Sequence, residues 1–378
     1  MWFLYLLLLY VFFTSYVIFR SESKWKIMKI GYYSINKKSF YLFFIFVFFC
    51  FFSSLRYPKL GTDTYVYFEL FDAICKNNYS IKFRLKPEWG YLIINKIISI
   101  FTNNKQLFLL IINTFIIYSF LSYIKKYSQS VWFSVILFIL MGYFDTSMNL
   151  IRFNIAFAIT LYAHKFLIEN NIKYFILLVA ISSLFHITSW IFIIAPIIYK
   201  INLNKISFAK FVIILTTFVF LTYIFTSKIL GTIFANITIF GDYENNENFG
   251  IQNKAKLAPI LNFIITYLTI IYTGWHYWKR FHIKTQDYIL FKLLILSSVF
   301  LILSFTFTPI GRLSYLFSYC SIVLIPNATA LIKNNKKRFI LSTSIIFLFI
   351  LRYFVIAYFR PEWTGVYPYK FFFQNFNL

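Results

Sequence analysis

The sequence predicts an all-α, polytopic integral membrane protein, and two properties of the chain indicate this class. Of its 378 residues, 60% are hydrophobic and only 13% are charged, whereas soluble proteins carry about 25% charged residues. Apolar runs of the length that crosses a bilayer, about 20 residues, also recur from one end of the chain to the other. These properties exclude a soluble enzyme, a disordered chain and a secreted disulfide scaffold.

Hydropathy along the chain predicts about 10–12 transmembrane helices. No internal repeat or linker interrupts them, so we expect a single membrane domain over residues 1–378. The first run lacks a basic start and a cleavage site, which predicts a retained helix. The clear spans are 2–19, 40–55, 107–124, 131–145, 150–168, 211–230, 258–278, 288–308, 312–332 and 339–359.

Two apolar segments, 89–102 and 174–199, do not have the length of one ordinary span. The first is short and carries Lys96, and the second is too long and contains His186 and Pro196. We predict re-entrant or half-helices in both, with the halves of the second meeting near His186. One tilted helix that buries His186 at mid-depth is the alternative. Half-helices require protein or a wet cavity around them.

The chain carries 37 Lys and Arg residues against 12 Asp and Glu residues. The basic residues lie in short clusters between apolar runs, which is typical of cytoplasmic loops and not of a nucleic-acid surface. With these basic clusters in the cytoplasm, the loops 56–88 and 231–257 and the tail 360–378 lie outside.

The three cysteines show no metal-binding spacing, and no nucleotide or zinc-hydrolase motif occurs, so we expect no metal or cofactor.

Several polar side chains fall in the predicted outer loop 56–88. Arg56 precedes a tight turn at Gly61 that presents the Asp63 carboxylate, and Tyr65 and Glu88 follow. A solvated loop with incidental charges is the alternative interpretation.

Two arginines begin apolar helices on the same side: Arg152, with Asn154 nearby, and Arg312, with Tyr315 nearby. At a helix start, the backbone dipole and the free N–H groups add to the attraction for an anion. A guanidinium group also binds phosphate through paired hydrogen bonds. We therefore predict a diphosphate clamp of Arg152 and Arg312, and snorkelling to the headgroups is the alternative.

His186 lies within an apolar segment and has serine and threonine neighbours. An ionisable residue is costly inside a membrane, which favours a functional role over that of a hydrogen-bonded core histidine. The neighbouring hydroxyl groups are expected to bond one ring nitrogen and orient the other.

These residues also form a series of motifs between about residue 50 and residue 320. The motifs are Arg56 with Gly61-Thr-Asp63-Thr-Tyr65, Glu88-Trp-Gly-Tyr91, Arg152-Phe-Asn-Ile-Ala156, Phe185-His186, and Arg312-Leu-Ser-Tyr315. Their order resembles the EpsG-like family of bacterial exopolysaccharide and O-antigen repeat-unit polymerases, the Wzy type. Phe153 stands where that family often has Gln.

The resemblance implies a metal-independent glycosyltransferase of the bacterial cytoplasmic membrane, with its active face outside. It would transfer a growing chain from undecaprenyl diphosphate to a sugar hydroxyl of another lipid-linked unit, making O-antigen, capsule or exopolysaccharide. A flippase and a chain-length regulator of the same pathway are implied partners.

The resemblance also implies roles for individual residues. Arg152 and Arg312 would stabilise the leaving diphosphate, and His186 or Asp63 would act on the acceptor hydroxyl. The implied substrate-binding residues are Arg56, Glu88, Tyr65, Tyr315 and Asn154.

The same residues are compatible with other classes of function. A ligase-like or other lipid-phosphate-dependent glycosyltransferase would use the arginines in the same way with a different acceptor. A flippase would share the basic cavity and need no base, but transporters often have paired halves, and no repeat is visible here. A structural scaffold leaves the two outer arginines unexplained.

The predicted orientation has a direct test. Cysteines placed at positions 63, 146 and 308 are expected to react with a membrane-impermeant reagent from outside. The distribution of Lys and Arg clusters places all three positions on the outer side of the membrane. Labelling only from the cytoplasm would overturn this topology.

Overall fold

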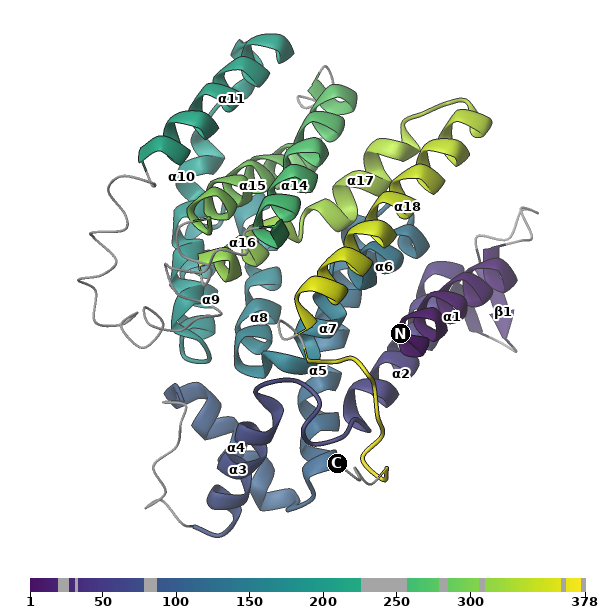
Figure 1. The fold of residues 1–378 in the computed structure, drawn as a ribbon, viewed down its shortest axis with the longest axis vertical. Coiled ribbons are helices and arrows are strands. Elements are labelled where there is room, and N and C mark those ends of the chain that lie inside the picture. Colours follow the sequence, from purple (N-terminus) through teal and green to yellow (C-terminus); the bar gives the residue numbers. More distant parts are fainter. Residues whose placement is uncertain are drawn as a thin grey trace. The chain divides into compact units, whose positions relative to one another are not determined.

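A computed structural model describes residues 1–19, 27–30, 33–77, 87–225, 257–278, 285–305, 310–361 and 365–374 (Figure 1). Helices dominate these residues and confirm the all-α class. The described exception is a hairpin of two short strands, β1 (Ile27–Ile30) and β2 (Tyr33–Asn36), which pair antiparallel. Most of the predicted outer loop 231–257 and the labelling position 308 lie outside the described residues.

Within the described ranges, nine helices are long and apolar enough to cross a membrane. The pair α6 (Val131–Leu140) and α7 (Tyr143–Asn149), bent by 55°, makes a tenth if it is one span. The ten correspond to the ten clear spans predicted from hydropathy. The others are α1 (Trp2–Phe19), α2 (Lys37–Ser54), α5 (Lys105–Tyr127), α8 (Ile151–Ile168), α11 (Phe208–Phe225), α14 (Leu257–Tyr277), α15 (Thr285–Leu303), α16 (Gly311–Ser318) continued by α17 (Ser321–Ala330), and α18 (Asn335–Phe359).

The two ambiguous segments form short helices. The first is α4 (Trp89–Phe101), which packs beside α3 (Thr64–Cys75) (Figure 1). The second consists of α9 (Ile172–Ser183), a 3₁₀-helix η1 (Ile187–Ile194) and α10 (Ala195–Lys200), followed by the short turn η2 (Leu203–Lys205). The helix therefore breaks at His186, as predicted. The re-entrant course of this segment stays a prediction.

The described chain forms two compact units. Unit 1 comprises residues 1–164, 173–190 and 344–378, and unit 2 comprises residues 165–172 and 191–343. Seven of the predicted site residues lie in unit 1, and Arg312 and Tyr315 lie in unit 2. The single membrane domain stays a prediction.

Aromatic side chains fill the core of unit 1. Phe3 of α1 stacks on Tyr369 with 4.1 Å between ring centroids, and Phe49 of α2 packs on Phe144 of α7 at 4.4 Å. All four rings are buried. Aromatic pairs at such distances add stabilisation to the burial of their area. This core therefore joins α1 to the C-terminal segment and α2 to α7, and α2 ends directly before the predicted outer loop 56–88.

The C-terminal segment also supports that loop. The Tyr57 amide donates to the Lys370 carbonyl and the Phe372 amide to the Leu55 carbonyl, both over 2.9 Å. Further along, the Gly61 amide donates to the Gly365 carbonyl over 2.9 Å. The described part of the tail thus runs beside residues 55–61 and satisfies their backbone groups.

The start of α4 lies directly against the helix break before His186. The Gly90 amide donates to the Leu184 carbonyl over 2.8 Å, and a Cβ atom on residue 90 would lie 2.6 Å from that carbonyl oxygen. Only glycine permits this approach. The contact brings Glu88, two residues earlier, to the break.

Replacing Gly90 by Ala is expected to lower the stability of the protein by about 1–3 kcal/mol, because the added methyl group overlaps a backbone atom. The control is Gly311→Ala at the start of α16, where the nearest atom lies 3.4 Å from the new Cβ. Thermal unfolding in detergent measures both variants. Equal melting temperatures for the two variants would contradict the contact.

Candidate functional site

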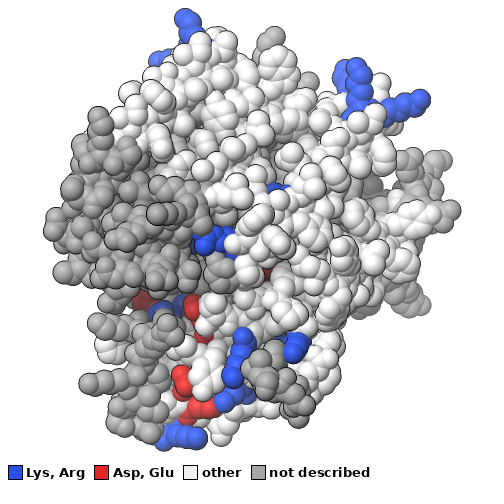
Figure 2. Space-filling model, in the orientation of Figure 1, with Lys and Arg blue, Asp and Glu red and all other residues white. Residues whose placement is uncertain are grey.

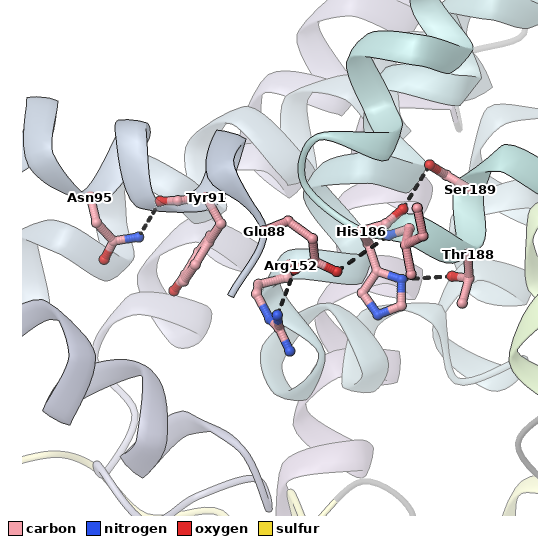
Figure 3. A network of polar contacts seen from close by, with 8 residues as sticks. Glu88, Tyr91, Asn95, Arg152, His186, Thr188 and Ser189 are labelled. Atoms are coloured by element: carbon pink, nitrogen blue, oxygen red, sulfur yellow. Dashed lines mark hydrogen bonds and ion pairs between the residues drawn. The ribbon is translucent and has the colours of Figure 1, made fainter. Parts of the chain in front are cut away.

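An ion pair at the start of α8 forms the centre of the candidate site (Figure 3). Arg152 Nη1 lies 2.5 Å from Glu88 Oε2, and the side chains are 11% and 21% exposed. The second carboxylate oxygen, Glu88 Oε1, accepts a hydrogen bond from the Ile187 amide over 3.2 Å. Glu88 therefore joins the start of α4, the start of α8 and the break that contains His186.

Two buried tyrosines accompany this ion pair. The rings of Tyr67 on α3 and Tyr91 on α4 meet edge to face with 5.6 Å between centroids. Burial raises the pKa of the Tyr67 phenol to about 12, the charge of Asp63 adds to this rise, and Arg152 opposes it. Tyr67 is therefore a neutral hydrogen-bond donor beside the guanidinium group at neutral pH.

The sequence motifs predicted no role for either tyrosine. Both lie in the quoted motifs or directly beside them: Tyr67 follows Tyr65 by two residues, and Tyr91 ends the Glu88 motif. The chain has 30 tyrosines, so the presence of a tyrosine in a motif does not by itself indicate a function. Only the structure shows that these two are buried beside a charged group.

His186 is half-buried beside the same ion pair. Its Nδ1 lies 2.6 Å from Thr188 Oγ1, and its ring meets the edge of Phe153 with 5.5 Å between centroids. The Ser189 hydroxyl donates to the His186 carbonyl over 2.9 Å. A neighbouring hydroxyl thus holds one ring nitrogen, as the sequence predicted, and fixes the orientation of the imidazole.

Asp63 precedes α3 at the N-cap position, but its side chain makes no capping hydrogen bond. The Thr62 hydroxyl lies within hydrogen-bond distance of Asp63 Oδ1, at 3.2 Å, and of Asn149 Oδ1, also at 3.2 Å. Tyr65, in the first turn of α3, is 49% exposed. Asp63 is partly exposed, so a bound molecule could contact its carboxylate.

Arg56 and Asn154 have roles in the framework of unit 1. The Arg56 guanidinium is fully buried and donates to the carbonyls of Ser53 and Met148, the latter over 2.7 Å. Burial lowers the pKa of Arg56 to about 10, so it stays charged at neutral pH. Asn154 is 1% exposed, and its amide donates to the carbonyls of Thr146 and Leu150 over 2.8 and 2.9 Å.

Arg312 and Tyr315 lie in the first turns of α16, in unit 2, and both are partly exposed. The start of a helix at Arg312 agrees with the sequence analysis. The pairing of Arg312 with Arg152 in a diphosphate clamp stays a prediction.

On the face shown in Figure 2, acidic side chains lie mainly in the lower part of the view, and Lys and Arg side chains lie both there and elsewhere on the face. The acidic side chains on this face lie mainly over α3 and α4, mixed with Lys and Arg. Among the described residues, no three His, Cys, Asp or Glu side chains come together as metal ligands. The arrangement described around Arg152 offers a guanidinium, a carboxylate, an imidazole and a phenol, which suits anion binding and proton transfer.

A family model described as the EpsG family matches residues 39–371, which is nearly the whole chain. The match includes every predicted site residue. No curated protein and no solved structure matched the chain in the same comparisons.

Glu88→Gln is expected to lower the stability of the protein by about 1–3 kcal/mol, because it leaves a mostly buried guanidinium without its counter-charge. Thermal unfolding in detergent measures the effect. The control is Asp72→Asn, which breaks the more exposed Lys105–Asp72 pair and is expected to cost under about 1 kcal/mol. A smaller loss for Glu88→Gln than for the control would contradict the structural importance of the ion pair.

Proposed function

The chain belongs to the EpsG family, and on that premise we propose that it polymerises lipid-linked oligosaccharide repeat units at the outer face of the bacterial cytoplasmic membrane. The family supports a role in joining polysaccharide repeat units. We further propose undecaprenyl diphosphate as the carrier of the donor chain and a sugar hydroxyl of a second lipid-linked unit as the acceptor. The observation that carries the proposal is the Arg152–Glu88 ion pair beside His186.

The reaction exchanges one bond to the donor sugar for another. The acceptor hydroxyl oxygen attacks the anomeric carbon, the bond from that carbon to the diphosphate oxygen breaks, and the hydroxyl proton passes to a base. Negative charge grows on the diphosphate as it leaves. A cation fixed where that charge develops accelerates such a reaction most effectively.

Arg152 meets this requirement. It lies in the first turn of α8, where backbone N–H groups without helical partners also favour an anion. In the structure Arg152 pairs with Glu88, and a diphosphate with its greater charge competes with that single carboxylate. The Tyr67 phenol, neutral at physiological pH, adds a hydrogen-bond donor to the same place.

His186 and Asp63 are the candidate bases. The Thr188 hydroxyl fixes the imidazole through Nδ1, so Nε2 would accept the proton from the acceptor hydroxyl. The Asp63 carboxylate would orient the acceptor sugar or share this task. From its sequence motif, Arg312 would supply a second guanidinium to the diphosphate, and a flippase and a chain-length regulator would work with the protein.

Arg152→Ala and Arg312→Ala are each expected to reduce polymer formation by about 100-fold or more, as loss of a donor to a developing charge does, while the protein still inserts. Arg152→Lys is expected to restore little activity, because an ammonium group lacks the planar pair of donors. Polymer formed from purified lipid-linked repeat units measures the effect.

The matched control is Arg338→Ala, which removes an exposed arginine at the start of α18 and is expected to leave polymer formation unchanged. Polymer of normal amount and length from both Arg152→Ala and Arg312→Ala would rule out their proposed roles. Full activity of Arg152→Lys would support simple snorkelling of the arginine.

A further inference from the structure

The turn before α3 is fastened to the last residue of α7. Asn149 Nδ2 donates to Thr62 Oγ1 over 3.1 Å, and the Asp63 amide donates to Asn149 Oδ1 over 3.1 Å. Thr62 Oγ1, held in this way, lies 3.2 Å from Asp63 Oδ1 and 3.2 Å from Asn149 Oδ1, and its single hydrogen can go to either acceptor. One asparagine side chain therefore fixes both the backbone of Asp63 and the hydroxyl group beside its carboxylate.

Gly61 allows the turn to approach Asn149 closely. Its φ of +87° lies in the left-handed region, and a Cβ atom at this position would lie 3.0 Å from Asn149 Oδ1. A side chain here would meet both backbone strain and a steric contact. The backbone of the turn is therefore shaped to fit the asparagine.

A second side chain fixes the same end of α7. The buried Arg56 guanidinium connects the Ser53 carbonyl at the end of α2 with the Met148 carbonyl beside Asn149. The Thr64 hydroxyl donates to the same Met148 carbonyl over 3.4 Å. Cations stabilise the carbonyl end of a helix. Arg56 thus ties α2 to α7, and Thr64 ties α3 to the same carbonyl of α7.

The Asp63 carboxylate does not cap the helix that it precedes. Aspartate at an N-cap ordinarily accepts a hydrogen bond from the first turn of its helix, and Asp63 does not. Its side chain is partly exposed. A carboxylate whose backbone is fixed, and which makes no capping hydrogen bond to its own helix, suits contact with a substrate.

We propose that Asn149 and Arg56 are positioning residues, which hold the Asp63 carboxylate in place for the acceptor sugar. Asn149 precedes Arg152 by three residues, so one rigid junction sets both the carboxylate and the guanidinium of the site. This inference rests on the proposed function. It also gives Arg56 a different role from direct substrate binding, because both terminal nitrogens of its guanidinium bond backbone carbonyls.

Kinetics of the purified full-length protein test the role of Asn149. With lipid-diphosphate-linked repeat units as donor, Asn149→Ala is expected to lower kcat/KM for the acceptor about five- to tenfold, as loss of one or two hydrogen bonds does, with the donor KM unchanged. In an Asp63→Asn background the same change is expected to cost less than about twofold, since residues that act through one another are not additive. A full additional loss in that background would overturn the proposal. The control is Asn103→Ala, at an exposed position.

Amide hydrogen exchange tests the positioning without any activity. Asn149→Ala is expected to raise the exchange of residues 60–64 about fivefold or more, because the Asp63 amide loses its acceptor, with residues 67–74 of α3 unchanged. Unchanged exchange at 60–64 would overturn the proposal. Wild-type protein that transfers nothing from the lipid-diphosphate donor would instead count against the proposed function, and exchange would still decide the role of Asn149.

Arg56→Lys separates positioning from substrate binding. A lysine keeps the charge but lacks the fork that reaches two carbonyls, so faster exchange at 60–64 with an unchanged donor KM is expected. A donor KM raised about tenfold with unchanged exchange would assign Arg56 to the diphosphate and overturn this part of the proposal.

Discussion

The pairing of Arg152 with Glu88 is the interaction on which the candidate site depends. A guanidinium group that is 11% exposed at the start of an apolar helix is costly without a partner of opposite charge. Glu88 supplies that charge and accepts the Ile187 amide with its other oxygen. The ion pair therefore fixes three segments that are far apart in the sequence. In the proposed reaction, the same guanidinium would exchange a weak anion, the carboxylate, for a stronger one, the diphosphate.

Breaks in the helices place the functional groups of unit 1. Each break frees backbone groups, and the low dielectric of a membrane protein makes unpaired groups expensive. Near the junction of α7 and α8, Arg56 bonds the carbonyl of Met148. The Asn154 amide adds a second donor to the carbonyls of Thr146 and Leu150, which already accept backbone amides. At the end of α6, Arg352 donates to the Leu140 carbonyl over 3.0 Å. Polar residues in this part of the chain thus build the framework as well as the site.

The motifs in the sequence singled out segments that the structure brings together, and the contacts of the individual residues come from the structure. Glu88, Arg152 and His186 were each singled out, and the structure brings them together. Arg56 and Asn154 were expected to bind substrate, and the structure shows their donors on backbone carbonyls. Asn149 was not selected, because its partners Thr62 and Asp63 precede it by 87 and 86 residues. No local pattern reports a contact of that separation.

The sequence by itself determined the membrane class, the ten clear spans and the helix break at His186. These follow from local hydropathy, because a span must satisfy its own backbone within about 20 residues. Only the tertiary structure decided which polar groups pair. In a chain with 12 acidic residues and 30 tyrosines, the choice of Glu88 as the partner of Arg152, and of Tyr67 as its neighbour, depends on how α3, α4 and α8 pack. Packing is a property of the whole fold. It determines which groups are buried, and burial determines how strongly charges attract and how strong each hydrogen bond is.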